Sequence, residues 1–276
     1  NGRYCYLDPR RGAMLAVAEA ARNVACAGGQ PIGATNCLNF GNPQRPEIMA
    51  QFVECLRGMG DACRALDFPV VSGNVSLYNE TKAEDGSGSA ILPTPAIGGV
   101  GLVEDWTKSA TLAFKATGDW VFVLGDGGGH LGQSLWLREI AGREEGPPPP
   151  VDLDRERQAG DFVRRLIAEG KVTAVHDVSD GGLLVAVAEM ALAGNIGAAL
   201  EQIGDHATAF GEDQGRYVVT SRNADTIQAA GFPMTRIGTT GGDSLRGAGR
   251  EISLDELRSA HEAFFPELMG GQPTVA

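Results

Sequence analysis

The sequence is short of positive charge. Its 23 lysines and arginines face 35 aspartates and glutamates, which gives a formal net charge of −12 over 276 residues. Binding along a nucleic-acid backbone needs clustered lysine and arginine, so the composition argues against a nucleic-acid partner. Long apolar runs are also missing: the charge-free stretch 86–103 contains Pro93 and Pro95, whereas a membrane helix needs about 20 mostly apolar residues. We therefore expect neither a nucleic-acid partner nor a membrane.

Patterned cysteine is lacking as well. The five cysteines include no CxxC pair and no histidine at zinc-ligand spacing, which excludes the common structural zinc sites. An odd number of cysteines in a chain of this size is typical of reduced thiols, so we expect a cytoplasmic protein. No signal peptide is apparent, and the chain begins at Asn1 instead of methionine, which suggests a fragment of a longer protein.

No catalytic nucleophile can be assigned. The four histidines are scattered, and none has a serine or cysteine in a nucleophile motif nearby. The glycine run 127–129 lacks the Lys-Ser/Thr of a phosphate-binding P-loop, so we interpret it as a loop. The sequence thus offers groups that hold ligands but no complete catalytic set.

What is present is the alternation of apolar strands and helices of an α/β protein with 43% apolar residues. The pattern restarts near residue 113, which predicts two α/β domains, residues 1–112 and 113–276. The predicted strands are 3–7, 69–71, 96–103, 119–124, 172–175, 217–220 and 235–238. The predicted helices are 12–27, 47–66, 155–169, 183–193 and 254–269, with a short helix near Ala224.

A polar stripe crosses the otherwise apolar helix 12–27. Glu19 and Asn23 are four residues apart and share a face, and Asp8 at the end of the preceding strand could reach the same point. Two carboxylates and an amide oxygen are ligands suited to Mg²⁺ and phosphate. The alternative is that Glu19 forms an internal ion pair with Arg22.

Further candidate groups follow predicted strands. Asp177 comes after an apolar strand, and residues 180–182 open a helix whose N-terminal amides would attract phosphate, although Asp180 could simply cap that helix. The loops 36–43 and 72–76 offer asparagine amides, a bare glycine backbone and a serine hydroxyl for a polar ligand. Either loop could equally be a structural turn.

Several phrases, taken in order, carry a family resemblance. They resemble the second half of the small-type phosphoribosylformylglycinamidine synthases, in the superfamily of aminoimidazole ribonucleotide synthetase-like proteins. The match covers essentially the whole chain. The phrases are Tyr6-Leu-Asp-Pro9, Ala16-Val-Ala-Glu-Ala-Ala-Arg-Asn23, Asn36-Cys-Leu-Asn-Phe-Gly-Asn-Pro43, Ser72-Gly-Asn-Val-Ser76, His176-Asp-Val-Ser-Asp-Gly-Gly182, Gly211-Glu-Asp-Gln214 and Ile237-Gly-Thr-Thr-Gly-Gly-Asp-Ser244.

The resemblance implies a fold and a reaction. Each half of such a synthase has an N-terminal and a C-terminal α/β domain, and the two halves pack as a pseudo-dimer. The implied reaction is the ATP-dependent amidation of formylglycinamide ribonucleotide to formylglycinamidine ribonucleotide in purine synthesis. ATP phosphorylates the amide oxygen, and ammonia from a glutaminase subunit, bridged by a small third subunit, displaces the phosphate.

The resemblance also assigns residues. Asn36 and Gly73 would lie near ATP, Asn74 at Mg²⁺ and Ser76 at the substrate, but the family usually carries aspartate where this chain has Asn36. The family's catalytic histidine belongs to the first half, so we expect no turnover by this chain alone. Related large-type enzymes hold a non-catalytic nucleotide (ADP) with Mg²⁺ at positions that match an auxiliary set of four residues: Asp8, Glu19, Asn23 and Asp177.

Two other interpretations stay open. The chain could be a structural docking half whose nucleotide site is vestigial, or another superfamily member such as a thiamine-phosphate or selenophosphate-producing enzyme. The latter should have an aspartate-rich motif near the N-terminus, where this chain has only Asp8. As partners we expect the N-terminal half of the enzyme, the glutaminase and the bridging subunit. An isolated half with an apolar pseudo-dimer face could also form a homodimer.

Overall fold

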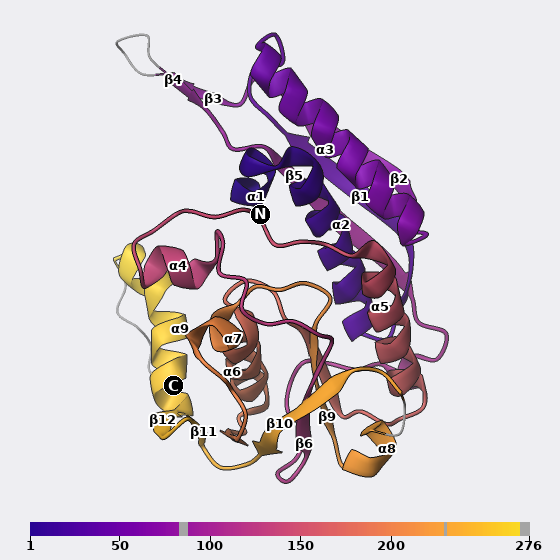
Figure 1. Ribbon diagram of the computed structural model, residues 1–276, viewed down its shortest axis with the longest axis vertical. Helices are drawn as coiled ribbons and strands as arrows, with labels where there is room; N and C mark the ends of the chain where they lie inside the picture. The colour runs from indigo at the N-terminus through magenta and orange to yellow at the C-terminus, as the bar shows by residue number, and fades with distance from the viewer. Residues whose placement is uncertain (83–87, 229–230, 271–276) are drawn as a thin grey trace.

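The computed structural model describes residues 1–82, 88–228 and 231–270 (Figure 1). Helices α2 and α3 pack together on one face of a three-stranded sheet in the order β2-β1-β5. β1 runs parallel to β2 and antiparallel to β5. The elements of this first part are α1 (Gly2–Leu7), α2 (Pro9–Cys26), β1 (Gln30–Asn39), α3 (Pro46–Ala65), β2 (Val70–Ser76), the hairpin β3 (Glu80–Lys82) and β4 (Gly88–Ala90), and β5 (Thr94–Leu102).

Helix α2 forms where the sequence supplies both a start signal and small side chains. The Asp8 carboxylate caps it by accepting from the Arg11 N–H at 3.0 Å, and Pro9 occupies the first turn, where a missing N–H is harmless. Its alanine-rich faces let neighbouring helices approach closely. At the crossing with α3, a Cβ on Gly58 would lie 2.0 Å from the carbonyl oxygen of Arg10, so this contact requires glycine.

A seven-stranded mixed sheet, in the order β12-β11-β8-β10-β6-β9-β7, forms the second part. Its strands alternate between two cores: Val121 and Val123 face the core with α6, whereas Phe122 and Leu124 face the core with α5. The elements are η1 (Trp106–Lys108), β6 (Trp120–Leu124), α4 (Leu135–Glu139), α5 (Leu153–Ala168), β7 (Ala174–Asp177), α6 (Gly182–Gly194), β8 (Ala198–Leu200), α7 (His206–Phe210), β9 (Tyr217–Ser221), α8 (Ala224–Gln228), β10 (Met234–Thr240), β11 (Ser244–Gly247), β12 (Arg250–Ser253) and α9 (Leu254–Leu268).

Three local predictions were wrong. The predicted strand 3–7 is the helix α1, which Asn1 caps and which buries the adjacent residues Tyr4 and Cys5. The predicted loop 72–76 lies in β2, and residues 36–39 of the predicted loop 36–43 lie in β1, because parallel pairing of these segments satisfies their backbone groups; residues 40–43 lie outside the strands, as predicted. The asparagines and glycine that suggested turns therefore sit within strands, with the exception of Asn42.

The remaining predictions concern organisation. The long predicted helices and the central strands are present within one to three residues of their predicted ends, and the fold is the expected mixed α/β arrangement. The predicted boundary between residues 112 and 113 falls in the segment that joins β5 to β6, and it stays a prediction. Among the described residues, no helix is both long enough and apolar enough to cross a membrane.

Candidate functional site

The residues expected near ATP meet across the β1–β2 pair. In the parallel register Asn36 lies opposite Gly73. A Cβ on Gly73 would stand 2.2 Å from Oδ1 of Asn36, so the amide can occupy its position only because residue 73 has no side chain. The two residues are thus one structural unit, which the sequence alone did not reveal.

Asn74 and Ser76 lie next to this pair in sequence but point the other way. Successive strand residues face opposite sides, so Asn36 shares the helix-covered face with Leu38, while Asn74 shares the open face with Cys37, its Nδ2 lying 4.0 Å from the Cys37 Sγ. Ser76 exchanges hydrogen bonds with the side chain of Asn79. The structure therefore gathers the four residues on two neighbouring strands but divides them between two faces.

The same sheet exposes an unusual amount of apolar surface. Its edge strand β2 is exposed along almost its whole length. Exposed apolar side chains of this kind mark an interaction site more often than a solvent-facing sheet. The exposed apolar residues of these three strands, from 45% to 69% accessible, are Ile32, Val70, Val71, Val75, Val100 and Leu102.

A buried ion cluster joins the two parts of the chain. The Arg22 guanidinium on α2 is 2% exposed and donates to Glu156 of α5 at 2.6 Å and to Gln214 at 2.9 Å. Its Nε lies 3.6 Å from the carboxylate of Asp177 at the end of β7. Arg22 therefore pairs with Glu156 and Asp177 from the second part of the chain, and not with Glu19.

Electrostatics in this cluster are strongly coupled. Burial raises the pKa of Glu156, although Arg22 opposes that rise. Burial would also raise the pKa of Asp177, but its hydrogen bond to His176 and the charge of Arg22 outweigh burial and hold it below its usual value. The guanidinium thus supplies the positive charge that two buried carboxylates need.

The auxiliary set does not come together as predicted. Asp8 caps α2 and pairs with Arg11 at 3.4 Å, whereas Glu19 lies 11 residues further along the same helix, about 16 Å away along its axis. Asn23 is exposed, and Asp177 is engaged by Arg22. Within the described residues no group of three or more histidine, cysteine or acidic side chains could hold a metal ion. Asp8 therefore cannot share a ligand with Glu19.

Glu19 borders a small pocket with Tyr4, Asp180 and Glu212. Although the residue as a whole is exposed, enclosure of its carboxyl, with repulsion from Asp177 and Asp180, raises the pKa of Glu19. Glu212 accepts three hydrogen bonds, from the Tyr4 hydroxyl at 2.5 Å and from the N–H groups of Leu135 and Gly181 at 2.8 and 2.9 Å.

Sequence reasoning gave Glu212 no role beyond its place in the phrase Gly211-Glu-Asp-Gln214. The signal it lacked was the buried position of Glu212, which is 1% exposed and ties the start of the chain to the beginnings of α4 and α6. An acidic residue between glycines looks the same in sequence whether it faces solvent or a buried set of donors.

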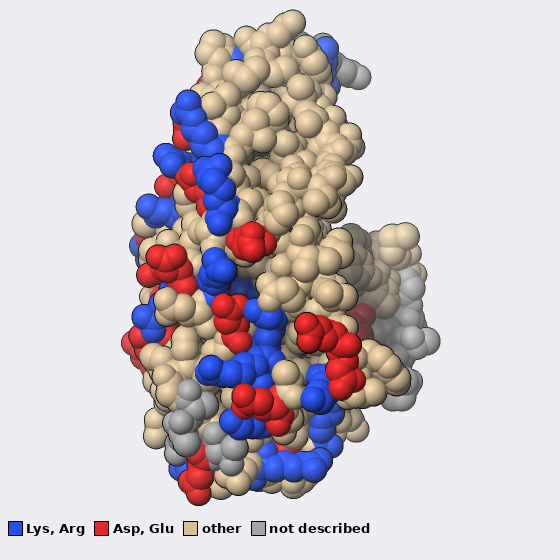
Figure 2. All heavy atoms as spheres, turned by 90° about the vertical axis from the view of Figure 1, so that its right-hand side faces the viewer, with Lys and Arg blue, Asp and Glu red and all other residues tan. Residues whose placement is uncertain are grey.

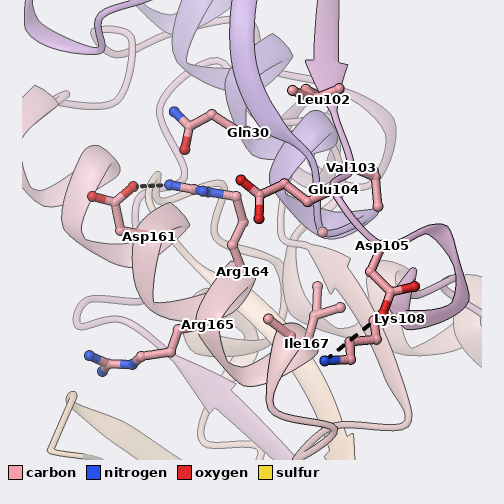
Figure 3. A pocket seen from close by; sticks show the side chains of 12 residues that line it. Gln30, Leu102, Val103, Glu104, Asp105, Lys108, Asp161, Arg164, Arg165 and Ile167 are labelled. Carbon is pink, nitrogen blue, oxygen red and sulfur yellow. Dashed lines mark hydrogen bonds and ion pairs between the residues drawn. The ribbon is translucent and has the colours of Figure 1, made fainter.

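A larger pocket of about 400 Å³ lies where the end of β5 meets α5 (Figure 3). The Arg164 guanidinium extends between Asp161 and Glu104 and donates to Asp161 at 2.5 Å, while Lys108 lies 4.0 Å from Asp105. The pocket is lined by three cationic side chains, Lys108, Arg164 and Arg165, and by the same number of carboxylates, so its charges balance. The pocket is thus a polar cleft without net charge, and it selects neither anions nor cations.

The same balance holds over the surrounding surface. Figure 2 shows lysine and arginine interleaved with aspartate and glutamate along this side of the molecule. Asp61, for example, accepts from both Arg10 and Arg64, at 2.5 and 2.7 Å. These exposed pairs neutralise one another and form no basic patch of the kind that binds nucleic acid.

Comparison with known families covers most of the chain. The model for the N-terminal domain of AIR synthase related proteins matches residues 1–103, and the model for their C-terminal domain matches residues 116–246. The phosphoribosylformylglycinamidine synthase subunit PurL of Zymomonas mobilis is 59% identical over 276 residues, which is 97% of this chain. The same subunit of Novosphingobium aromaticivorans is 59% identical over 98% of this chain. The chain spans only 38% and 36% of these relatives.

Solved structures agree on the fold. PurL of T. maritima complexed with FGAR superimposes with a TM-score of 0.69 at 16% identity, over 92% of this chain and 44% of that one. The hydrogenase maturation protein HypE gives 0.61 at 16% identity, over 88% of this chain and 81% of that one. Likeness at this identity establishes the fold alone. With both domain models matched in order, the chain belongs to the AIR synthase related proteins and carries their N-terminal and C-terminal domains.

Proposed function

We propose that this chain is the C-terminal portion of a phosphoribosylformylglycinamidine synthase, the ligase that converts formylglycinamide ribonucleotide to its amidine with ATP and ammonia in purine synthesis. The observation that carries the proposal is the 59% identity to a PurL subunit across 97% of this chain. The fold likeness to T. maritima PurL complexed with ATP, with a TM-score of 0.63, is consistent with it. The chain alone would not turn over.

The exposed sheet supports a partner of the same architecture. Ile32, Val71 and Val100 are each about half exposed or more, which is costly for an isolated protein in water. A second three-stranded sheet laid against this one would bury them. We propose that the N-terminal half of the enzyme supplies that sheet, and that two copies of this chain pair there when the N-terminal half is absent.

For the reaction itself, we propose that the β1–β2 edge lends ligand-binding groups to a site completed by the partner half. Asn36, held by the bare backbone of Gly73, would hydrogen-bond ATP through its amide. The hydroxyl of Ser76 would hydrogen-bond the substrate. Because Asn36 carries no charge, it can orient the nucleotide without repelling its phosphates or fixing a cation.

Magnesium fits this chain only weakly. Asn74 offers one amide oxygen on an exposed strand, and the remaining ligands of a Mg²⁺ ion would have to come from the partner half or from the phosphates. The predicted auxiliary Mg²⁺ set does not fit, because Arg22 already compensates Asp177 and Asp8 lies far from Glu19.

The test uses the full-length enzyme. Ser76→Ala should raise KM for formylglycinamide ribonucleotide about tenfold, because one hydrogen bond to a charged or polar substrate group is lost. The melting temperature should change little. Ser72→Ala, on the same face of the same strand, is the matched control and should leave KM unchanged. Equal KM values for both variants would remove Ser76 from the substrate site.

The alternative function is a structural docking half without a catalytic contribution, and the buried Arg22 cluster favours it for the auxiliary site. If it is right, calorimetric titration with ADP should give no binding that depends on Mg²⁺, and Ser76→Ala should be silent. If instead ADP binds near one site per chain with Mg²⁺ and Glu19→Gln abolishes that binding, the auxiliary nucleotide site exists despite the separation of Asp8.

Further partners follow from the same proposal. A glutaminase subunit would deliver ammonia and a small subunit would bridge the two, in line with the structure of PurLQS from Thermotoga maritima, which superimposes with a TM-score of 0.65. A cytoplasmic location would suit the five free thiols, of which Cys5 and Cys55 are buried. Co-purification with the tagged full-length enzyme would test the assembly. The glutaminase and the small subunit should both be retained with the enzyme, and their retention should fall when either of the two is diluted.

A further inference from the structure

The glycine loop after β6 presents backbone donors that nothing in the described part of the chain uses. Gly127, Gly128 and Gly129 have φ values of 96°, 124° and 126°, a run that side chains other than glycine rarely adopt. The flanking residues are bonded: Gly125 N–H donates to Pro233 at 3.0 Å and His130 N–H donates to Asp213 at 2.8 Å. Among the described residues, no acceptor meets the N–H groups of the three glycines 127–129.

A buried arginine lies directly under this loop. Arg216 is 3% exposed, and its Nε and Nη1 have no hydrogen-bond partner in the described residues. A Cβ built on Gly128 would stand 3.6 Å from Nη2 and 3.7 Å from Nη1, which places the guanidinium against the loop backbone. No carboxylate of the described chain comes within 4.0 Å of it, although the Asp213 charge attracts it from further away.

A buried cation in this state is incompletely compensated. Burial lowers the pKa of Arg216, because water no longer solvates its charge and Asp213 offsets only part of the loss. The other buried arginine of the described residues, Arg22, does have a close partner, Glu156 at 2.6 Å. The orphaned nitrogens of Arg216 therefore point to a group that comes from outside the chain.

We propose that the loop 127–129 and Arg216 form a binding site for a tetrahedral oxyanion, the phosphate group of a phosphorylated small molecule. Consecutive backbone N–H groups on a glycine loop make a concave anion site, and a guanidinium matches two phosphate oxygens at once. Glycine is favoured at residue 128 because its φ of 124° is one that L side chains rarely adopt, and a Cβ there would contact the guanidinium at 3.6 Å. The overall charge of −12 repels anions, so binding would depend on these local donors.

Space for the rest of a ligand lies beside the loop. A cavity of about 330 Å³ borders Gly127, Asp213 and Arg155, and Arg155 is already paired with Asp126 at its rim. The carboxylates at the rim can accept from hydroxyl groups but would repel a second anionic group. This arrangement suits a phosphate monoester of a hydroxylated compound more than a diphosphate. None of its residues belongs to β1 or β2, so the site stands or falls independently of the proposed synthase function.

The test measures thermal unfolding of the 276-residue chain in inorganic phosphate and in chloride at equal ionic strength. Phosphate at ten times its dissociation constant should raise the melting temperature by about 2 to 4 °C. Arg216→Met should abolish this rise, and in chloride it should melt no lower than the wild type, because it removes an uncompensated buried charge. Glycerol 3-phosphate should bind more tightly than inorganic phosphate if the cavity takes the organic part.

A second pair of variants keeps the test decisive if Arg216→Met does not fold. Gly128→Ala should lose the phosphate effect, whereas Gly118→Ala should keep it. Gly118 also has a positive φ, 91°, but a Cβ there meets no atom within 4 Å, so it has comparable backbone strain without touching the site. The proposal is overturned if phosphate does not stabilise the wild type, if it stabilises Gly128→Ala equally, or if Arg216→Met lowers the melting temperature in chloride while keeping the phosphate effect.

Discussion

Replacement of Arg22 by methionine tests how the two parts of the chain are held together. The substitution keeps the length of the side chain and removes its charge, leaving Glu156 buried without a cation and Asp177 with His176 as its remaining partner. Both carboxylate side chains are 3% exposed, and Arg22 lies 2.6 Å from the first and 3.6 Å from the second. Removal of one partner from a buried pair destabilises by about 3 to 5 kcal/mol, and we expect the upper part of that range because two carboxylates lose one partner.

The pH dependence of the deficit identifies its cause. Without Arg22, burial raises the pKa of Glu156 still further above its unfolded value, whereas Asp177 keeps its hydrogen bond to His176. A carboxyl group with a raised pKa in the folded state destabilises the fold at every pH at which the unfolded chain ionises that group. This destabilisation disappears as pH falls below the unfolded pKa of about 4. The stability difference between wild type and Arg22→Met should therefore be largest near pH 8 and shrink steadily towards pH 5. A packing defect would give a difference that is independent of pH.

Urea unfolding at pH 5, 6.5 and 8 provides the assay. For a chain of this size a slope of about 3 kcal/mol/M converts the expected deficit into a midpoint shift of about 1 to 2 M. Arg10→Met is the matched control, because Arg10 pairs with Asp61 at the surface at 2.5 Å and should leave the midpoint nearly unchanged. If Arg22→Met shifted the midpoint no more than Arg10→Met, or equally at all three pH values, the reasoning would be refuted.

Three further predictions concern single contacts. Burial alone would lower the pKa of His176, but its hydrogen bonds to two carboxylates raise it to about 9. The stabilisation that protonated His176 gives the fold is therefore complete below pH 6.5 and is lost as pH rises through 9. In His176→Gln this pH-dependent part of the unfolding free energy, roughly 1 to 2 kcal/mol after allowing for solvent screening, should disappear from the stability–pH curve. Tyr4→Phe removes the 2.5 Å hydrogen bond to the buried Glu212 and should lower the unfolding free energy by about 1.5 to 3 kcal/mol, measured in urea. Gly73→Ala would place a Cβ 2.2 Å from Oδ1 of Asn36 and should lower the unfolding free energy by about 1 to 3 kcal/mol. The same substitution should weaken ATP binding by the full-length enzyme. Unchanged ATP affinity would show that Asn36 does not contact the nucleotide.

The elements that sequence predicted well are those with a long apolar period. Helix 47–66 was expected and α3 spans Pro46–Ala65, because a 20-residue amphipathic pattern has one obvious solution. The region 36–39 failed for the opposite reason. Its polar residues look like a turn, and only the parallel pairing with β2, some 35 residues later, makes it a strand. Local patterns cannot contain such long-range hydrogen bonding.

The candidate site shows the same limit. Sequence reasoning singled out Glu19, Asn23 and Asp177, and it considered Arg22 only as a partner of Glu19. Helical spacing correctly placed Glu19 and Asn23 on one face of α2, but it could not reveal that Arg22 points across the junction to Glu156, 134 residues away in sequence. A carboxylate set suited to a metal and a carboxylate set neutralised by arginine are indistinguishable until the cation is located in space.

Arg22 and Arg216 are both buried, and the difference between them separates internal structure from an external site. The charge of Arg22 is compensated by two carboxylates of the chain, although its Nε makes no hydrogen bond, and a metal beside Asp177 would face its repulsion. Arg216 has comparable burial but two nitrogens without a hydrogen-bond partner in the described chain, next to three free backbone donors. Because an uncompensated buried charge destabilises a fold, retaining one beside a glycine loop makes physical sense only when an anion compensates it. The electrostatic argument that excludes a metal ion beside Arg22 therefore predicts an anion beside Arg216.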